Sequence, residues 1–205
     1  MGKILILNGS PRAPKSNSKR YAEIFARHCP AETDYRNITK NNHKDLCTML
    51  GEYTDVLFVF PLYADALPAV FLNFLKTLEA CPPVCKPVVS ILINCGFLEP
   101  EQNEVAVRMM KLFCRRNGYV VGSVLMLGGG EAILDTPFKY VAKRSIRSLA
   151  RSVASGSYRT LRATMPLPKF LFRLAADVYW TGYGKRFGVT KKQMQTMEVE
   201  GNLRG

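Results

Sequence analysis

Short runs of apolar residues alternate along the chain with segments in which apolar residues recur every three or four positions. The runs end at polar residues, prolines or glycines, as do strands that are buried on both faces of a parallel sheet. They predict five strands, at Lys3–Asn8, Asp34–Ile38, Val56–Phe60, Pro87–Asn94 and Tyr119–Leu127. The second of these runs is the least apolar and predicts the weakest strand.

The segments between the runs predict helices. After the first run, Tyr21, Ile24, Phe25 and His28 occupy the i, i+3, i+4 and i+7 positions of one helix face. Further helices are expected over residues 44–53, 69–79, 100–118 and 136–153, the third of these beginning at a proline and ending at a glycine. Five strands that alternate with five helices predict an α/β fold with a doubly wound parallel sheet and helices on both faces.

The composition is that of a globular protein, with 47% apolar and 22% charged residues among 205. We expect no membrane span, because the most apolar stretch, residues 56–75, contains two prolines, an aspartate and an asparagine. Only four consecutive apolar residues precede Asn8, so we expect no signal peptide. Six scattered cysteines without a CxxC pair, and only two histidines, predict reduced thiols, no metal site and a cytoplasmic protein.

Ligands of doubly wound sheets bind at the carboxyl ends of the strands, which draws attention to the loops after Asn8, Phe60, Asn94 and Leu127. The first loop runs into a helix N-terminus and offers hydroxyls, backbone N–H groups and the Arg12 guanidinium, a combination that suits a phosphate dianion. It has neither the Walker nor the Rossmann glycine pattern, which disfavours ATP and a dinucleotide. An ordinary turn with a helix cap is the alternative. The position after the first buried strand favours the phosphate site.

The next two loops suit a flat ring. Pro61 to Pro68 combines an aromatic residue, small residues and two stiffening prolines, and Asn94 to Pro100 places a glycine where backbone can approach a ring edge. Together with the first loop they predict a mononucleotide site. Glycines 128–130 are interpreted as the exit from the fifth strand, with a border of the ring as the alternative. A G-x-S-x-G motif is absent and both histidines lie away from these loops, which disfavours hydrolase chemistry, so we predict no catalytic side chain.

The sequence resembles the flavodoxin-like NAD(P)H-dependent FMN reductases, near their iron–sulfur flavoprotein and multimeric flavodoxin branches. Three matches within residues 1–155 carry the resemblance: Gly9-Ser-Pro-Arg12 with Ser16-Asn-Ser18, Pro61-Leu-Tyr63 through Pro68 into residues 71–76, and Asn94-Cys-Gly-Phe97. It implies a flavodoxin-like, five-stranded doubly wound sheet. It also implies FMN ligands, namely Ser10, Arg12, Ser16, Asn17 and Ser18 for the phosphate, Pro61, Leu62, Tyr63 and Ala64 along the ring, and Asn94, Cys95, Gly96 and Phe97 at its pyrimidine edge.

The resemblance implies an enzyme that passes hydride from NADPH or NADH to FMN and then, by ping-pong kinetics, to a second small-molecule acceptor such as a quinone or a flavin. Only Cys81 and Cys85 correspond to the cluster cysteines of the iron–sulfur branch, and two thiolates cannot hold a cubane, so we expect FMN without iron. The alternatives are a flavodoxin-type electron carrier, which the basic charge disfavours, and a non-enzymatic basic binding module.

Basic residues are concentrated near the C-terminus, where residues 135–205 carry 14 basic and 4 acidic side chains of a chain with net charge +13. We therefore divide the chain into an FMN-binding domain, 1–155, and a basic helical extension, 156–205. Residues 166–180 are too apolar to be left exposed, which predicts packing on the domain or on a partner in a homodimer. A membrane surface and loose nucleic-acid contacts are alternatives that we do not favour, and we expect no specific nucleic acid.

Overall fold

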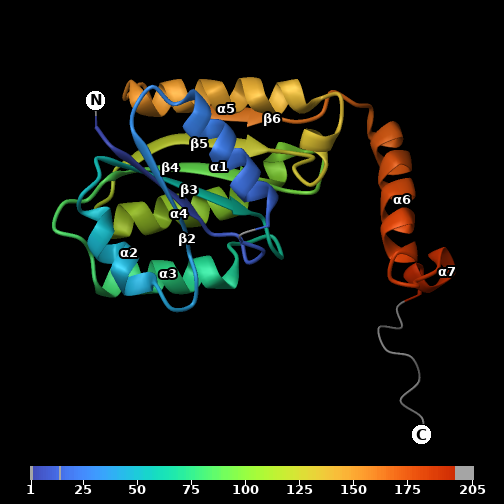
Figure 1. The fold of residues 1–205 in the computed structure, drawn as a ribbon, viewed down its shortest axis with the longest axis horizontal. Helices are drawn as coiled ribbons and strands as arrows, with labels where there is room; N and C mark the ends of the chain where they lie inside the picture. The colour runs from blue at the N-terminus through green and yellow to red at the C-terminus, as the bar shows by residue number, and fades with distance from the viewer. Residues whose placement is uncertain (1, 14, 197–205) are drawn as a thin grey trace, which may run out of the picture. The chain divides into compact units, whose positions relative to one another are not determined.

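The computed structural model describes residues 2–13 and 15–196 and is drawn in Figure 1. The chain divides into two compact units, one ending at Met165 and the other beginning at Pro166. The strands of the first unit are β1 (Ile4–Asn8), β2 (Thr33–Asn37), β3 (Asp55–Pro61), β4 (Val88–Asn94), β5 (Val121–Leu127) and β6 (Thr160–Ala163). Its helices are α1 (Asn17–His28), α2 (His43–Leu50), α3 (Ala69–Ala80), α4 (Glu104–Arg116) and α5 (Lys139–Ala154), with short 3-10 turns η1 (Pro100–Asn103) and η2 (Ile133–Asp135).

The strands form one parallel sheet in the order β2-β1-β3-β4-β5-β6. β1 pairs on both sides, so that Ile4 lies opposite Thr33 of β2 and Asp55 of β3. The chain thus moves outward from β1 to β2 and returns past β1 to β3, and the winding direction reverses between β1 and β3. This reversal is the place where doubly wound sheets bind their ligands.

Apolar side chains fill both sides of the sheet, because successive residues of a strand point to opposite faces. On one face, Phe58 and Phe60 of β3 pack against Phe71 of α3, with ring centroids 5.0 and 4.6 Å apart. Helices α2, α3 and α4 cover this face, and α1 and α5 cover the other (Figure 1). All five residues of β1 are buried, so the strand that leads into the first candidate loop is firmly held.

The prediction of five strands is wrong because the sheet has a sixth, β6. It pairs with β5 from Val124 opposite Thr160 to Leu127 opposite Ala163. β6 is a four-residue edge strand, and its alternation of polar and apolar residues is too short to identify a strand from the sequence. It lies beyond residue 155 and extends the first unit to Met165. The parallel α/β sheet and the other five strands are confirmed.

The second unit is a short helical hairpin of α6 (Lys169–Lys185) and α7 (Lys191–Met194). A turn with Gly188 at a φ of 74° joins them, and α7 begins at a capping box formed by Thr190 and Gln193. The two helices meet at Gly184, where a Cβ would lie 2.7 Å from the sulfur of Met194. Within the described part of the chain, none of the helices has the length and apolarity that a membrane span requires.

Candidate functional site

Four loops follow the carboxyl ends of β1, β3, β4 and β5. We name them L1 (residues 9–13 and 15–16), L2 (62–68), L3 (95–99) and L4 (128–135). L1 and L2 leave the two strands between which the winding reverses, and L3 leaves the next strand of the sheet. These loops therefore stand where the topology of the sheet expects a ligand.

L1 and the first turn of α1 bring together the five residues predicted to bind phosphate, namely Ser10, Arg12, Ser16, Asn17 and Ser18. Ser16 is the N-cap of α1, and its Oγ accepts a hydrogen bond from the backbone N–H of Lys19 at 3.2 Å. The first N–H groups of a helix have no acceptor within it, and with the helix dipole they attract an anion. L1 therefore has the local geometry of an anion site.

The side chains of these five residues differ in what they offer. The Arg12 side chain is 65% exposed. Ser10 and Ser18 are buried, and the Ser10 Oγ accepts from the Arg12 backbone N–H at 3.3 Å. The Ser16 Oγ also accepts from the Asn8 side chain at 3.3 Å, and because it is the acceptor in both of its bonds, its proton can be donated to an anion.

A buried polar cluster below L1 was missed by the sequence analysis, which placed Asn8 only at the end of a strand. Its Nδ2 donates to the Tyr35 hydroxyl at 2.9 Å and to the Asn37 Oδ1 at 3.2 Å. Its Oδ1 accepts from the Ser10 backbone N–H at 2.9 Å. Asn8 thereby ties the beginning of L1 to β2. Recognising the cluster requires the register of β1 against β2, which places Asn8 opposite Asn37.

L2 closes on itself in a tight turn. Tyr63 and Ala66 exchange two backbone hydrogen bonds, of 3.1 and 2.9 Å. The two residues between them, Ala64 and Asp65, have φ values of 46° and 55°, a left-handed conformation that is uncommon outside glycine. Strained backbone of this kind is often found at ligand sites. The turn presents Tyr63 with 42% of its surface exposed.

Asn94, at the end of β4, connects the loops instead of pointing to solvent. Its Nδ2 donates to the Phe60 carbonyl at 3.2 Å and to the Ser18 Oγ at 3.4 Å, and its backbone carbonyl accepts from the Leu62 N–H at 2.7 Å. Asn94 is 5% exposed. Asn94 thus connects the start of L2, through its backbone, and the first turn of α1, through its side chain, to the start of L3.

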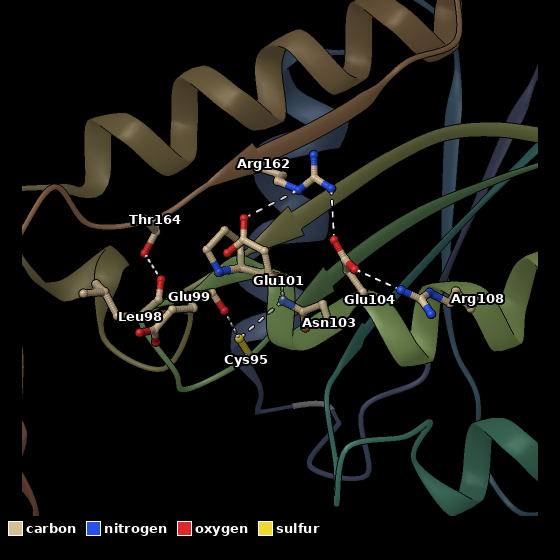
Figure 2. Close-up of polar contacts among 10 residues, drawn as sticks. Cys95, Leu98, Glu99, Glu101, Asn103, Glu104, Arg108, Arg162 and Thr164 are labelled. Carbon is tan, nitrogen blue, oxygen red and sulfur yellow. Dashed lines mark hydrogen bonds and ion pairs between the residues drawn. The ribbon is translucent and has the colours of Figure 1, made fainter. Parts of the chain in front are cut away.

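L3 turns its cysteine inward and its aromatic residue outward. The Cys95 sulfur accepts a hydrogen bond from Asn103 Nδ2 at 3.3 Å (Figure 2). The Phe97 side chain is 53% exposed. The Cys95 backbone N–H donates to the Leu127 carbonyl and its carbonyl accepts from the Gly130 N–H, so the sulfur and both backbone groups are engaged within the protein. Burial raises the pKa of the Cys95 thiol, which keeps it protonated. A Cβ on Gly96 would meet nothing within 4 Å, which leaves room beside L3.

Residues of β6 and of the segment after it bond to L3 and to the η1–α4 segment that follows L3. The Thr164 hydroxyl donates to the Leu98 carbonyl, and Arg162 forms ion pairs with Glu101 at 3.7 Å and Glu104 at 3.1 Å (Figure 2). The hydrogen bond from Arg162 is the largest of the influences that lower the pKa of Glu104. The position of L3 thus depends on a strand that the sequence analysis did not predict.

L4 folds back onto the first turns of α1. The Asn17 side chain donates to the Glu131 carbonyl at 2.8 Å, and Arg20 forms two hydrogen bonds with the Asp135 carboxylate, of 2.8 and 2.6 Å. The Glu131 carboxylate reaches L1, where its Oε1 lies 3.5 Å from Nη1 of Arg12. L4 is therefore more than an exit from β5, because it places a carboxylate beside the only arginine of L1.

The contact of L4 with α1 also includes a buried tyrosine. The Tyr21 hydroxyl donates to the Gly130 carbonyl at 2.6 Å, and burial raises the pKa of this phenol far above its ordinary value. Tyr21 therefore remains a neutral donor at every physiological pH.

Among the described residues, no group of three or more histidine, cysteine, aspartate or glutamate side chains is arranged to hold a metal ion.

No family model matches the sequence, and no curated protein is similar to it. Solved structures do match. An NAD(P)H:quinone oxidoreductase from Methanothermobacter marburgensis has a TM-score of 0.54 at 14% identity, covering 75% of this chain and 94% of that one. An FMN-dependent NADH-azoreductase from Bacillus anthracis, solved in complex with FMN, has 0.55 at 12%, covering 74% and 99%. A flavodoxin from Streptococcus pneumoniae TIGR4 has 0.55 at 14%, covering 75% and 98%. At these identities the likeness establishes the fold, which is flavodoxin-like as expected.

Proposed function

We propose that this chain is an FMN-dependent NAD(P)H oxidoreductase, which uses NADPH or NADH to reduce a small-molecule acceptor. The proposal rests mainly on one observation: L1, L2 and L3 converge at the carboxyl edge of the sheet beside the β1–β3 reversal. L1 carries an anion cradle there, and L2 and L3 each carry an exposed aromatic residue. Two structures of the same fold, a quinone oxidoreductase and an FMN-dependent azoreductase, support the same class of reaction.

In this proposal the phosphate of FMN binds at L1. The exposed guanidinium of Arg12 supplies a positive charge, the hydroxyls of Ser10 and Ser16 supply donors, and the N-terminus of α1 supplies backbone N–H groups. Asn17 and Ser18 belong to the same turn, and their side chains keep that turn in place against L4 and Asn94. This donor set is complementary to a dianion.

The ring of FMN is placed between L2 and L3. Pro61, Leu62, Tyr63 and Ala64 form one border, and Gly96 and Phe97 form the other, with the room beside Gly96 taking the edge of the ring. Asn94 and Cys95 support these borders through the bonds described above and do not contact the ring with their side chains.

Bound FMN supplies the redox chemistry, accepting hydride from the nicotinamide and delivering reducing equivalents to the acceptor. The role of the protein is to bind and orient FMN and its substrates. For this reason we assign no general acid, base or nucleophile. An exposed Tyr63 and an exposed Phe97 leave the ring accessible from outside. A nicotinamide and an acceptor such as a quinone or a flavin then occupy the same place in turn, which gives ping-pong kinetics.

The test begins with titration of FMN into the purified full chain, followed by anaerobic addition of NADPH or NADH. We expect the visible absorbance of FMN to change on binding and to bleach rapidly with at least one nicotinamide. Absence of FMN uptake would overturn the cofactor assignment and favour a binding module. Uptake of FMN with slow bleaching by both nicotinamides would overturn the oxidoreductase and favour a flavodoxin-type carrier.

A further inference from the structure

Helix α6 carries its polar and charged side chains at intervals of four residues, at Lys169, Arg173, Asp177, Thr181 and Lys185. Neighbouring members of this series lie close together on the helix surface. With 3.6 residues per turn, each step turns by about 40°, so the five side chains form a polar stripe that winds around about 160° of the helix. The other positions of α6 are apolar, aromatic, alanine or glycine, so the rest of the helix is without charge.

The apolar surface of α6 is exposed and has two parts. Phe170, Leu174 and Val178 form the row next to the polar stripe, with 68%, 63% and 68% of their surfaces exposed. The second part is an aromatic cluster at the C-terminal half of the hairpin, formed by Tyr179, Trp180, Tyr183 and Phe187. Each of these four side chains is also exposed.

The charge of the hairpin is strongly positive. Its described residues include six cations, Lys169, Arg173, Lys185, Arg186, Lys191 and Lys192. The only acidic residue among them is Asp177, which forms an ion pair with Lys191 at 2.6 Å. An occupant of this surface must therefore be both apolar and negatively charged.

We propose that the α6–α7 hairpin binds the surface of an anionic lipid bilayer, with α6 lying in the plane of the interface. Aliphatic side chains next to a basic stripe enter the boundary between headgroups and acyl chains, as interfacial helices do. Tryptophan and tyrosine rings favour the headgroup level, and lysines and arginines are attracted by the negative surface potential.

The sequence predicts that this segment packs on the domain or on a partner in a homodimer, and charge distinguishes a homodimer from a bilayer. In a symmetric dimer the same patch of each copy contacts the other, which would bring two strongly basic hairpins together. An anionic bilayer instead neutralises the cations and receives the apolar rows. The hairpin therefore complements a lipid surface better than it complements a second copy of itself.

The test uses the purified full chain and two kinds of vesicle, one of phosphatidylglycerol with phosphatidylcholine and one of phosphatidylcholine alone. Trp180 is the only tryptophan, so its emission reports directly on the hairpin. We expect co-sedimentation with the anionic vesicles and a blue shift of the emission, both reduced by salt. Neither effect is expected with phosphatidylcholine.

Two pairs of substitutions separate charge from apolar contact. Lys185→Glu with Arg186→Glu should weaken vesicle binding by about ten-fold or more, while the matched reversal Arg115→Glu with Arg116→Glu on α4 should leave it unchanged. Leu174→Asp with Val178→Asp should abolish binding. Val120→Asp is the control for this pair, because Val120 belongs to the first unit and is 61% exposed, and this substitution should leave vesicle binding unchanged.

Three outcomes would overturn the proposal. The first is equal binding to both kinds of vesicle, and the second is emission that is blue-shifted without lipid and unchanged by it. The third is that the unaltered chain does not bind vesicles and sediments as a dimer, which the substitutions Leu174→Asp and Val178→Asp dissociate. The experiment requires neither FMN nor a nicotinamide, so its result is independent of the proposed enzymatic function.

Discussion

Replacing Arg12 with glutamine should weaken FMN binding, and replacing Glu131 with glutamine should strengthen it. The two side chains form an ion pair, with Nη1 of Arg12 3.5 Å from Oε1 of Glu131. A phosphate at L1 would compete with Glu131 for the guanidinium, and the carboxylate would remain near the dianion. Arg12→Gln removes the attraction, whereas Glu131→Gln removes both the competitor and a like charge.

The exposure of both side chains limits how much each substitution can change the affinity for FMN. The Arg12 side chain is 65% exposed and that of Glu131 is 41% exposed, so solvent screens their interactions strongly. Two unit charges at 4 Å interact by about 1 kcal/mol in water. Losing the Arg12 contact should therefore cost about 1–1.5 kcal/mol, or roughly ten-fold in the dissociation constant. Removing the Glu131 charge should contribute about 0.5–1 kcal/mol, or roughly two- to five-fold tighter binding.

The assay is quenching of FMN fluorescence at low and at high salt, where higher salt should shrink both effects. Riboflavin, which lacks the phosphate, should bind the two variants and the unaltered chain equally well. Arg116→Gln, at the end of α4 that lies away from the loops, makes the same charge change and should leave FMN affinity as it is. Weaker FMN binding by Glu131→Gln, or unchanged binding by Arg12→Gln, would refute the placement of the phosphate at L1.

Three further predictions concern the scaffold. Asn94→Leu should lower the free energy of unfolding in urea by about 1–3 kcal/mol, because it removes the donor to the buried carbonyl of β3; an unchanged midpoint would contradict this. Cys81 and Cys85 are exposed, whereas burial raises the pKa of Cys114 to about 12, so a thiol reagent at pH 8 should modify Cys81 and Cys85 first, and Cys85→Ser should remove amplitude from the fast phase. The hydrogen bond from Lys3 lowers the pKa of Asp34. This pair therefore stabilises the fold above the ordinary carboxyl pKa, and the stabilisation is lost as pH falls through the lowered pKa. Asp34→Asn should reduce Tm at pH 7 by an amount that disappears in strong acid.

The apolar runs carry enough information to predict β1, β3, β4 and β5, since a strand buried on both faces must be apolar throughout. β2 has no fully buried residue, and its run is correspondingly the weakest of the five. The runs also predict L1, because the serines and the arginine that follow Asn8 stand directly before a helix. β6 escaped because its alternation of polar and apolar residues covers only four positions, and its pairing with β5 identifies it as a strand. Hydrophobic periodicity reports burial, and an edge strand is partly exposed.

The contacts of the site that escaped prediction share one property, which is that the residues they join are distant in the sequence. Asn94 bonds to Ser18, 76 positions away, and Glu131 extends to Arg12 on the first loop. Hydrogen bonds of this kind depend on which loops the strand order brings together, and a local pattern cannot contain that order. Local chemistry can therefore nominate L1, L2 and L3 one at a time. The links between them follow only from the sheet. They include the hydrogen bonds of Asn94 and Cys95, two residues that are predicted as ligand contacts and whose side chains also connect the loops.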